Sequence, residues 1–445
     1  MSLKDQVFHH HVTRTSSKNN LAISYEEYQA LKNQVYEALN QSLGKELYSR
    51  EFGYKKLREE VYAVIRKVIF ASALPLTAAD RALLIQEIVD DILGLGPIES
   101  LLRDPDVTEI MVNSPTDVYA ERGGVLVRAD VEFHDQEQIR HVIERIVSAV
   151  GRRVDESSPM VDARLPDGSR VNAIVPPIAV DGPSFTIRKF SGRVADKDSL
   201  IRLGTITEEA AKFLEQAVVG KRNILISGGT GSGKTTTLNI LASLIPAEER
   251  IVTIEDSAEL RLGQEHVVRL ESRPPNMEKI GEITIRDLVR NALRMRPDRI
   301  VVGEVRDAAA LDMLQAMNTG HDGSLSTVHA NSSRDALSRI ETMASMSELR
   351  LPVSIIREQI GSAIDLLIHI ERFRDGSRKI TTITEVTGLD QGAVKLQDIF
   401  HYVYQKQEDG SPLGALVPTG CLPDCLEDLY ERGVEVDRSL FEVSA

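Results

Sequence analysis

Hydrophobic residues recur every three or four positions along the first hundred residues, a spacing that places them on one face of a helix. The spacing is seen in two sets of positions, first Tyr28, Leu31, Val35 and Leu39, then Leu57, Val61, Val64, Ile65 and Val68. A third amphipathic stretch, Ala78–Leu93, ends where Gly94 interrupts the helical pattern. The pattern predicts a small helical bundle over residues 21–102, a packing module with a charged surface.

Between residues 103 and 190, hydrophobic and polar residues alternate in short runs that are typical of half-buried strands. The predicted strands are 108–113, 117–121, 125–128, 161–165, 170–175 and 184–190. Asp167-Gly168 lies between two of these runs and is a hairpin signal. One amphipathic helix is predicted over 136–150. We therefore expect a compact α/β domain over residues 103–190.

After a polar linker over residues 191–206, strands and helices are predicted to alternate. The strands are 224–226, 250–254, 299–302 and 324–328, and the helices are 207–219, 236–241, 307–317 and 353–363, with another helix opened by Thr284. This alternation predicts a parallel sheet with crossover helices, an α/β fold with a RecA-like core in residues 207–445. Two final runs, 366–372 and 379–386, flank Asp375-Gly376 and predict an antiparallel hairpin. The last forty residues or so of the chain give no clear pattern.

Composition places the chain among ordinary proteins of about three domains, since it has 445 residues, of which 42% are hydrophobic and 27% charged. No apolar run approaches the ~18 residues of a membrane span, and no signal-peptide pattern opens the chain. We therefore expect a cytoplasmic protein that meets a membrane only through partners. The net charge of −14 and the absence of Trp disfavour nucleic acid as a partner.

Two further regions are assigned no chemistry. Residues 1–20, including His9–His11, are polar and without period, which predicts a disordered tail. The two cysteines, Cys421 and Cys425, indicate a reducing compartment. Their spacing could serve a metal, but no second Cys or His pair lies nearby, so structural or incidental thiols are the favoured interpretation.

Residues 228–235 read G-G-T-G-S-G-K-T, a complete phosphate-binding loop between a predicted strand and a predicted helix. The glycines let successive backbone N–H groups face phosphate oxygens, and the helix N-terminus adds partial positive charge. Lys234 is expected to reach the β- and γ-phosphates, and Thr235 to contact Mg²⁺. The motif therefore predicts binding of ATP and Mg²⁺, with nucleotide contacts from Gly228, Thr230, Gly231, Ser232, Gly233, Lys234, Thr235 and Thr236.

Acids follow two of the later predicted strands. Residues 253–260 contain three carboxylates, of which one could orient the water that attacks the γ-phosphate, although such a cluster alone is more often a solvated turn. Residues 298–307 contain a Walker B-like strand that ends in Gly303-Glu304. Because Gly303 replaces the usual Asp, we expect Glu304 to act on Mg²⁺ through bound water. Asp307 is expected to cap the next helix.

Two histidines, His321 and His329, flank the predicted strand over 324–328. A single histidine there would usually be structural. Two of them, at the ends of the strand that follows the acid-bearing one, predict residues that read the γ-phosphate and pass its presence to a neighbour.

Four sequence blocks have now been described: the phosphate loop, the acidic stretch 253–260, the Walker B-like stretch 298–307 and the stretch with His321 and His329. In this order they closely resemble the secretion ATPase superfamily that powers type II secretion, type IV pili and type IV secretion, over roughly residues 100 to 390. The resemblance implies a hexameric ATPase with a PAS-like α/β domain before its RecA-like core. It makes Glu259 the glutamate that activates water, Glu304 the Walker B glutamate, and His321 and His329 the histidines of the His box. It also matches Arg170 and Arg188 to N-terminal arginines that reach the nucleotide, in some members across a subunit boundary.

Three features are similar to the CpaF/TadA branch, which serves tight-adherence (Flp-type) pili: the helical N-terminal region, residues 165–173 (L-P-D-G-S-R-V-N-A) and residues 294–298 (R-M-R-P-D). The four-cysteine zinc module of many pilus-assembly and type II secretion ATPases is missing. The resemblance therefore implies a motor that acts on an inner-membrane platform protein from its cytoplasmic face, in pilus extension or retraction. Conjugation-type relatives also lack the zinc module and remain the nearest alternative.

Other classes of function remain open. A nucleic-acid motor is compatible with a RecA-like core, but no helicase-type acidic motif follows the Walker B strand. A nucleotide-gated scaffold would bind ATP and hydrolyse it rarely, yet Glu259 and Glu304 together favour turnover. A P-loop kinase would need an acceptor-substrate lid, and none is recognisable.

Overall fold

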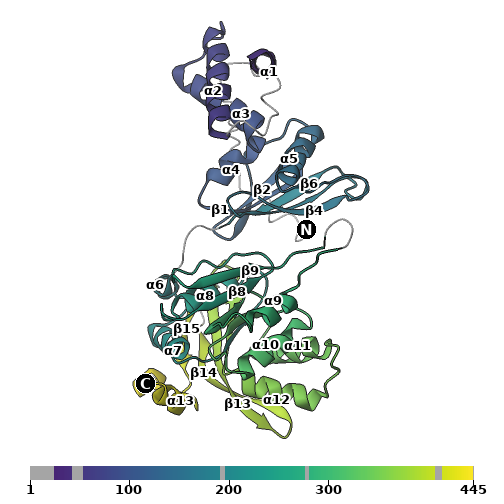
Figure 1. The fold of residues 1–445 in the computed structure, drawn as a ribbon. Coiled ribbons are helices and arrows are strands. Elements are labelled where there is room, and N and C mark those ends of the chain that lie inside the picture. The colour runs from purple at the N-terminus through teal and green to yellow at the C-terminus, as the bar shows by residue number, and fades with distance from the viewer. Residues whose placement is uncertain (1–24, 43–53, 191–195, 276–279, 406–412, 444–445) are drawn as a thin grey trace, which may run out of the picture. The chain divides into compact units, whose positions relative to one another are not determined.

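The computed structural model describes residues 25–42, 54–190, 196–275, 280–405 and 413–443 (Figure 1). The chain divides into two compact units, residues 1–191 and 192–445, and each is described by itself. The predicted tail over residues 1–20 and the start of the predicted linker lie outside the described residues. Within the described ranges, no helix has both the length and the apolar character needed to cross a membrane.

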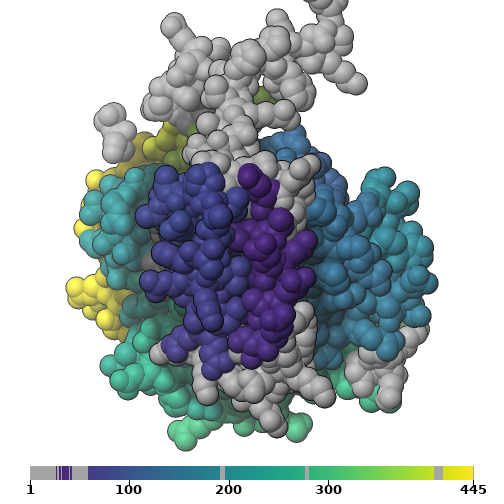
Figure 2. All heavy atoms as spheres, turned by 90° about the horizontal axis from the view of Figure 1, so that it is seen from above, coloured from purple at the N-terminus to yellow at the C-terminus, as the bar shows by residue number. Residues whose placement is uncertain are grey.

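The first unit begins with helices at the predicted positions. They are α1 (Tyr25–Ser42), α2 (Tyr54–Ala71), α3 (Ala78–Leu93), the 3-10 turn η3 (Gly96–Ile98) and α4 (Glu99–Arg103). Helix α1 lies alongside α2 (Figure 2). Leu31, Val35 and Leu39 of α1 are buried together with side chains of α2 and α3, as the helical spacing predicts. Thr77 begins α3 with a capping box to Asp80.

The rest of the first unit is an antiparallel sheet with one helix. Its elements are β1 (Val107–Ser114), β2 (Asp117–Arg122), β3 (Val125–Arg128), α5 (Gln136–Ala149), β4 (Met160–Arg164), β5 (Arg170–Ile174) and β6 (Ser184–Arg188). The strand order is β3-β2-β1-β6-β5-β4. Apolar side chains of α5, such as Ile143, share one core with Ile110 and Ile187 of the sheet. The predicted α/β arrangement is confirmed, with every strand within a few residues of its expected bounds.

The second unit contains a nine-stranded mixed sheet in the order β15-β14-β13-β12-β7-β11-β10-β8-β9. Its strands are β7 (Ile224–Gly228), β8 (Ile251–Glu255), β9 (Val267–Glu271), β10 (Arg299–Val302), β11 (Leu325–His329), β12 (Leu366–Arg372), β13 (Arg378–Asp390), β14 (Ala393–Gln405) and β15 (Leu413–Pro418). The strands from β12 to β9 in this order pair in parallel, which confirms the predicted parallel core. The strands β13, β14 and β15 extend it antiparallel, and sequence patterns missed β14 and β15.

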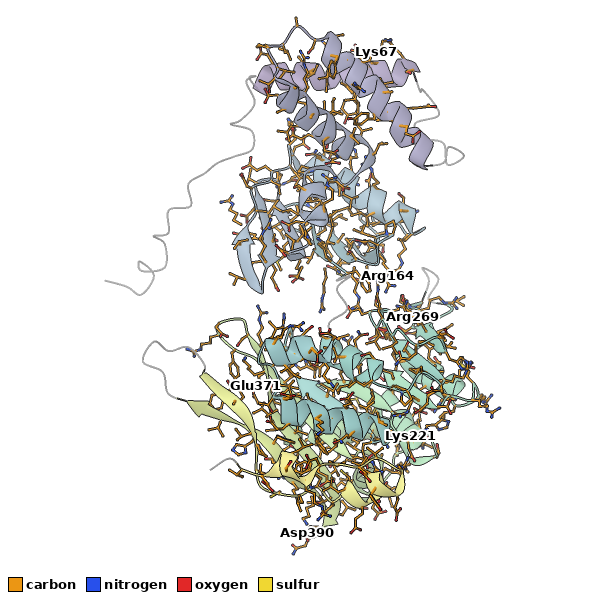
Figure 3. All side chains as sticks on the ribbon, turned by 90° about the vertical axis from the view of Figure 1, so that its left-hand side faces the viewer. Lys67, Arg164, Lys221, Arg269, Glu371 and Asp390 are labelled. Carbon is orange, nitrogen blue, oxygen red and sulfur yellow. The ribbon has the colours of Figure 1, made fainter. Side chains whose placement is uncertain are left out.

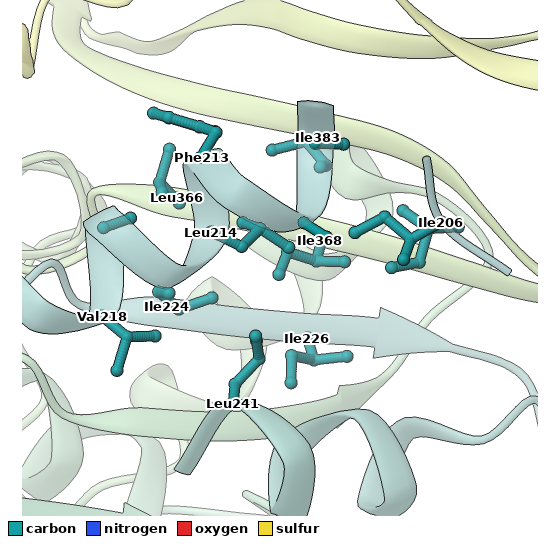
Figure 4. Close-up of a cluster of buried hydrophobic side chains, with 14 of the residues drawn as sticks. Ile206, Phe213, Leu214, Val218, Ile224, Ile226, Leu241, Leu366, Ile368 and Ile383 are labelled. Atoms are coloured by element: carbon teal, nitrogen blue, oxygen red, sulfur yellow. The ribbon is translucent and has the colours of Figure 1, made fainter. Parts of the chain in front are cut away.

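Helices cover both faces of this sheet. They are α6 (Lys197–Arg202), α7 (Glu208–Val219), α8 (Lys234–Ser243), α9 (Ile285–Ala292), α10 (Ala309–Asn318), α11 (Ser333–Ser345), α12 (Val353–Ala363), α13 (Leu426–Glu431) and the 3-10 turn η4 (Arg438–Phe441). Phe213, Leu214 and Val218 of α7 pack on strands β7, β12 and β13 on one face (Figure 4). Helices α9 to α12 enclose a second core on the other. The sheet is therefore buried on both sides, and its strand ends are the places where polar residues can meet.

Helix α6 lies in the predicted linker. Residues 197–202, expected as linker, form α6 because the Asp196 carboxylate accepts the backbone N–H of Ser199 and so caps the first turn.

Candidate functional site

Strand register brings four sequence blocks to one edge of the nine-stranded sheet. His329 of β11 pairs with Gly228 of β7, and the β10 residue Val302 pairs with Ser326 of β11. Strand β8 continues the row, because its Ile254 pairs with Val302. Since all four strands are parallel, the residues that follow them share the carboxyl edge of the sheet. This edge therefore carries the phosphate loop, the acidic turn after β8, the Walker B-like glutamate and one histidine.

The phosphate loop joins a fully buried strand, β7, to helix α8. Gly233 ends the loop with a φ of 100°, a conformation in which a glycine carries no steric cost, and α8 begins at Lys234. The Lys234 ammonium donates to the backbone carbonyls of Gly228 and Gly229, at 3.0 and 2.8 Å. The lysine is thus held at the loop that it is expected to serve.

The polar groups of this loop fit a polyphosphate with a divalent cation. The Ser232 hydroxyl is buried and has no hydrogen-bond partner among the described residues, so an incoming oxygen would satisfy it. Backbone N–H groups at the start of the ten-residue helix α8 and the Lys234 ammonium supply positive charge. Thr235 in the first turn of α8 and Glu304 after β10 offer the oxygen ligands that Mg²⁺ prefers.

Glu255 organises the acidic turn that follows β8. Its carboxylate is buried and accepts the backbone N–H of Glu259 at 2.6 Å and that of Leu260 at 3.0 and 2.9 Å. Burial raises the pKa of the Glu255 carboxyl above its ordinary value, even though these bonds favour its ionised form. Glu255 therefore anchors the turn, whereas half-buried Glu259 is the carboxylate carried by it. The local pattern did not tell the three carboxylates of this turn apart, and only the family resemblance singled out Glu259.

The structure gives a steric reason for the glycine at position 303. A side-chain carbon on Gly303 would lie 2.9 Å from Cγ of Glu255, closer than such atoms approach. The Gly303 backbone is fixed on both sides, because its N–H donates to Ile254 and its carbonyl accepts the Thr327 hydroxyl, at 2.8 and 2.7 Å. Glu255 thus fills the space that the usual Walker B Asp would need.

Arg306 links the two acidic blocks, and sequence reasoning missed it. Its guanidinium donates to Glu304 at 2.6 Å and lies 3.3 Å from the carboxylate of Asp256. Because the Arg306 side chain is 64% exposed, this bridge can open without unpacking the core. The N-cap of α10 is Ala308 and not the predicted Asp307, whose carboxylate accepts the N–H of Ala309 at 3.0 Å from one residue earlier.

A buried histidine lies beside the phosphate loop and was also missed. Nδ1 of His369, on β12, is 2.8 Å from the Ser227 hydroxyl, one residue before the loop. Burial lowers the pKa of the His369 imidazole, while Glu371 partly opposes that shift. The ring is therefore favoured in its neutral form in the folded protein.

The two His-box histidines do not meet. His329 lies at the carboxyl end of β11, opposite Gly228, whereas His321 precedes the amino end of that strand. A five-residue strand separates them, so within one chain only His329 lies at the edge of the phosphate loop, and the action of His321 on a nucleotide stays a prediction. Residues at the two ends of a strand lie at opposite edges of a sheet. His321 and His329 are therefore far apart within one chain although they are close in sequence.

Arg170 and Arg188 belong to the first unit, where they are direct partners on β5 and β6. Arg164 of β4 pairs with Arg170 in the same row, so three arginines lie side by side on one face of the antiparallel sheet. The opposite face is the one packed in the core with α5. Their action on a nucleotide stays a prediction.

Comparison with known proteins places these features in context. The model of a family described as "Type II/IV secretion system protein" matches residues 91–403, a region that includes every predicted site residue. The putative conjugal transfer protein Rv3659c of Mycobacterium tuberculosis is 36% identical over 333 residues, which are 74% of this chain and 94% of that protein. The conjugal transfer protein TrbB of Rhizobium radiobacter is 36% identical over 292 residues, 64% of this chain and 86% of that protein. The crystal structure of the VirB11 ATPase from the Brucella suis type IV secretion system aligns with 64% of this chain and 91% of its own, at 29% identity and a TM-score of 0.36.

Proposed function

The chain belongs to the type II/IV secretion system protein family, and from this premise we propose that it hydrolyses ATP to ADP and phosphate to drive a secretion or pilus machine. The observation that carries the proposal is the meeting of four blocks at one sheet edge: the loop with Lys234, the turn with Glu259, Glu304 and His329. Cation, carboxylates and histidine at one edge are the groups that phosphoryl transfer to water needs.

Each block has a role in this proposal. Lys234 and the loop N–H groups hold the phosphates, and Glu259 orients the attacking water and accepts its proton. Thr235 and Glu304 would hold Mg²⁺, which would neutralise charge on the phosphates. His329, opposite Gly228, senses the γ-phosphate. Glu255 and Arg306 position the two glutamates.

The same reading extends to the first unit. Its row of three arginines, Arg164, Arg170 and Arg188, is suited to an anionic ligand. We propose that the chain works as a homo-hexamer at the cytoplasmic face of the inner membrane. Arg170 and Arg188 then approach a nucleotide, in the same or a neighbouring subunit, and turnover moves one unit against the other about the linker.

Two kinds of machine are candidates for what the proposed ATPase drives. The tight-adherence pilus is favoured by residues 165–173 and 294–298, and by the helices α1 to α3. A conjugation-type secretion system is favoured by the relatives named conjugal transfer proteins. The tight-adherence pilus requires an inner-membrane platform protein as partner of the chain. Nucleic acid is not expected to bind.

Glu304→Gln tests the proposed reaction. We expect steady-state ATP turnover to fall by about 100-fold or more, because the amide cannot stabilise Mg²⁺-bound water as a carboxylate does. Binding of ATP should persist, since the loop and Lys234 are untouched. The matched control is Glu348→Gln, an exposed acid after α11. Equal turnover in wild type and Glu304→Gln would contradict the assignment.

The trapped Glu304→Gln ring also tests the choice of machine. Solubilised membranes from the source cell should yield a pilus platform protein on this variant in the presence of ATP, and less on wild type. Recovery of DNA-transfer components would favour the conjugation-type machine. A titration with DNA at several salt concentrations complements this membrane-protein pulldown. Tight binding that weakens steeply with salt would indicate a nucleic-acid motor.

A further inference from the structure

The hairpin of β12 and β13 contacts the phosphate loop from the side away from the acidic blocks. Nε of Arg378 donates to the carbonyl of Gly231 at 3.1 Å. A side-chain carbon on Gly231 would lie 3.2 Å from Nη1 of Arg372, and one on Gly233 would lie 3.1 Å from Cδ of Arg378. The loop glycines therefore admit two arginine side chains as well as a left-handed backbone.

The Arg378 contact fixes the direction of one peptide group in the loop. In a trans peptide, the carbonyl and the following N–H point in opposite directions. With the Gly231 carbonyl held by Arg378, the N–H of Ser232 points back into the loop, where the Gly229 carbonyl is 3.4 Å away. That distance is long for a hydrogen bond, so this N–H is available to a phosphate oxygen. Gly231, with φ at +70°, needs such an external hold because glycine rotates easily.

The same hairpin contacts the end of the linker with its next two residues. Nζ of Lys379 donates to the carbonyls of Leu203 and Gly204, at 3.1 and 2.8 Å. The N–H of Ile380 donates to the carbonyl of Thr205 at 2.9 Å. Three consecutive residues thus contact the phosphate loop on one side and residues 203–205, between α6 and α7, on the other.

The hairpin is held together across its turn and packed against β14. Arg372 and Arg378 are direct partners across it, and the N–H of Phe373 closes the turn on the carbonyl of Ser377 at 2.8 Å. The Phe373 ring lies against Tyr402 and Tyr404 of β14, with ring centres 5.5 and 5.9 Å apart. Such aromatic packing resists bending of the hairpin, so displacement at one end is felt at the other.

We propose that the β12–β13 hairpin couples the phosphate loop to the linker, with Arg378 as its positioning residue on the nucleotide side and Lys379 as its attachment on the linker side. The proposal rests on the proposed binding of ATP. A phosphate that engages the N–H of Ser232 draws the Gly231–Ser232 peptide toward it, Arg378 follows through its bond to the Gly231 carbonyl, and the hairpin passes the shift to residues 203–205. The linker thereby receives the state of the nucleotide site through hydrogen bonds within one chain.

Hydrogen exchange of the full-length chain tests the coupling. Exchange is measured with and without a saturating non-hydrolysable ATP analogue and Mg²⁺, in wild type, Arg378→Ala, Arg378→Lys, Lys379→Ala and Arg374→Ala. Arg374 is the matched control, an exposed arginine in the turn of the same hairpin. Affinity for the analogue and steady-state kcat and KM are measured on the same samples.

In wild type and Arg374→Ala, the analogue should change exchange both in the loop, residues 229–236, and at residues 200–206. Arg378→Ala should bind the analogue about tenfold more weakly, the value of one charged hydrogen bond, and at saturation lose the change at 200–206 only. Arg378→Lys should restore part of the affinity for the analogue and part of the exchange response at residues 200–206. Lys379→Ala should keep wild-type affinity and KM but lose the linker response.

Two results would overturn the coupling: a wild-type linker response in Arg378→Ala, or no linker response in wild type while the loop is protected. Absence of protection in the loop of wild type is a different failure, since it would contradict nucleotide binding itself.

Discussion

The two ends of β7 show why a residue's edge of the sheet matters more than its chemical type. Lys221 precedes the amino end, and Lys234 follows the carboxyl end through the phosphate loop. Figure 3 labels Lys221 on the right-hand side of the second unit and Glu371, which follows the β12 partner of Gly228, on the left-hand side. Lys221 pairs with the carboxylate of Glu249 at 3.1 Å, whereas Lys234 donates to carbonyls of the loop itself.

The amino edge uses its charges to hold the fold together. Arg222 is buried there, with its guanidinium 3.4 Å from Asp365 and 2.9 Å from Asp428, a residue more than 200 positions away. Burial raises the pKa of the Asp365 carboxyl, which Arg222 opposes. At the carboxyl edge, by contrast, Glu304 is bound by an exposed arginine that can leave it. Charges fixed to one another stabilise a structure, and charges with exchangeable partners can serve a ligand.

The largest expected effect at the amino edge is on stability. Arg222→Ala removes the cation beside the half-buried Asp365 carboxylate, which still accepts the backbone N–H of Asn223, and should lower the free energy of unfolding by about 2–3 kcal/mol. ATP turnover of the folded fraction should stay within about twofold of wild type. The control is Arg432→Ala at the same edge, which breaks an exposed pair with Asp322 and should cost about 1 kcal/mol or less. Denaturant unfolding of both variants checks this; equal losses would contradict it.

The histidines at the two ends of β11 allow the two edges of the sheet to be compared by their effect on ATP turnover. His329→Ala should lower kcat by about 100-fold, because a positioned histidine beside the γ-phosphate contributes on this order. His321→Ala removes the same side chain at the other edge and should change kcat less than about threefold. Turnover and melting temperature are measured together. A loss in His321→Ala as large as in His329→Ala, with stability intact, would mean that His321 reaches a nucleotide in a neighbouring subunit.

The smallest effect is a pH dependence at the carboxyl edge. Burial lowers the pKa of His369 from its ordinary 6.5, so below pH 6.5 the unfolded chain binds a proton that the folded chain refuses. Its contribution to stability is therefore present above pH 6.5 and is lost as pH falls. Between pH 7.5 and 5.5, wild type should lose more stability than His369→Gln, by at most about 1.4 kcal/mol, the value of the one pH unit below 6.5. Parallel pH dependences of the two would contradict the neutral ring.

Local patterns predicted most elements of the fold, because their signals lie within each segment. The bounds of β10, β12 and α12 agree with the predicted ranges. Helix α11 was missed although its signals were present: Ser332 caps it through Asp335, and Ala336, Leu337 and Ile340 form its buried face. Strands β14 and β15 were missed for a different reason, since they depend on antiparallel partners rather than on helix–strand alternation.

The sequence predicted the candidate-site residues that lie at the carboxyl ends of the parallel strands. The phosphate loop, Glu259, Glu304 and His329 follow strands and reach the same edge. His321 precedes the predicted strand over 324–328 and His329 follows it, so the sequence already placed the two histidines at opposite ends of one strand. Glu255, Arg306 and Arg378 were unassigned since their roles come from contacts: a buried turn, a bridge between two acids and a hairpin on the loop.

The central claim is that ATP is hydrolysed at the carboxyl edge of the sheet, and a pair of lysine variants at the two ends of β7 tests it most directly. Lys234→Ala and Lys221→Ala each remove one ammonium, and Glu249 keeps its bonds to Arg299 at 2.7 and 3.0 Å in the second variant. The account predicts that steady-state ATP turnover falls by about 100-fold or more in Lys234→Ala and stays within about twofold in Lys221→Ala, with both proteins folded. Wild-type turnover in Lys234→Ala, or an equal loss in the two variants, would contradict it.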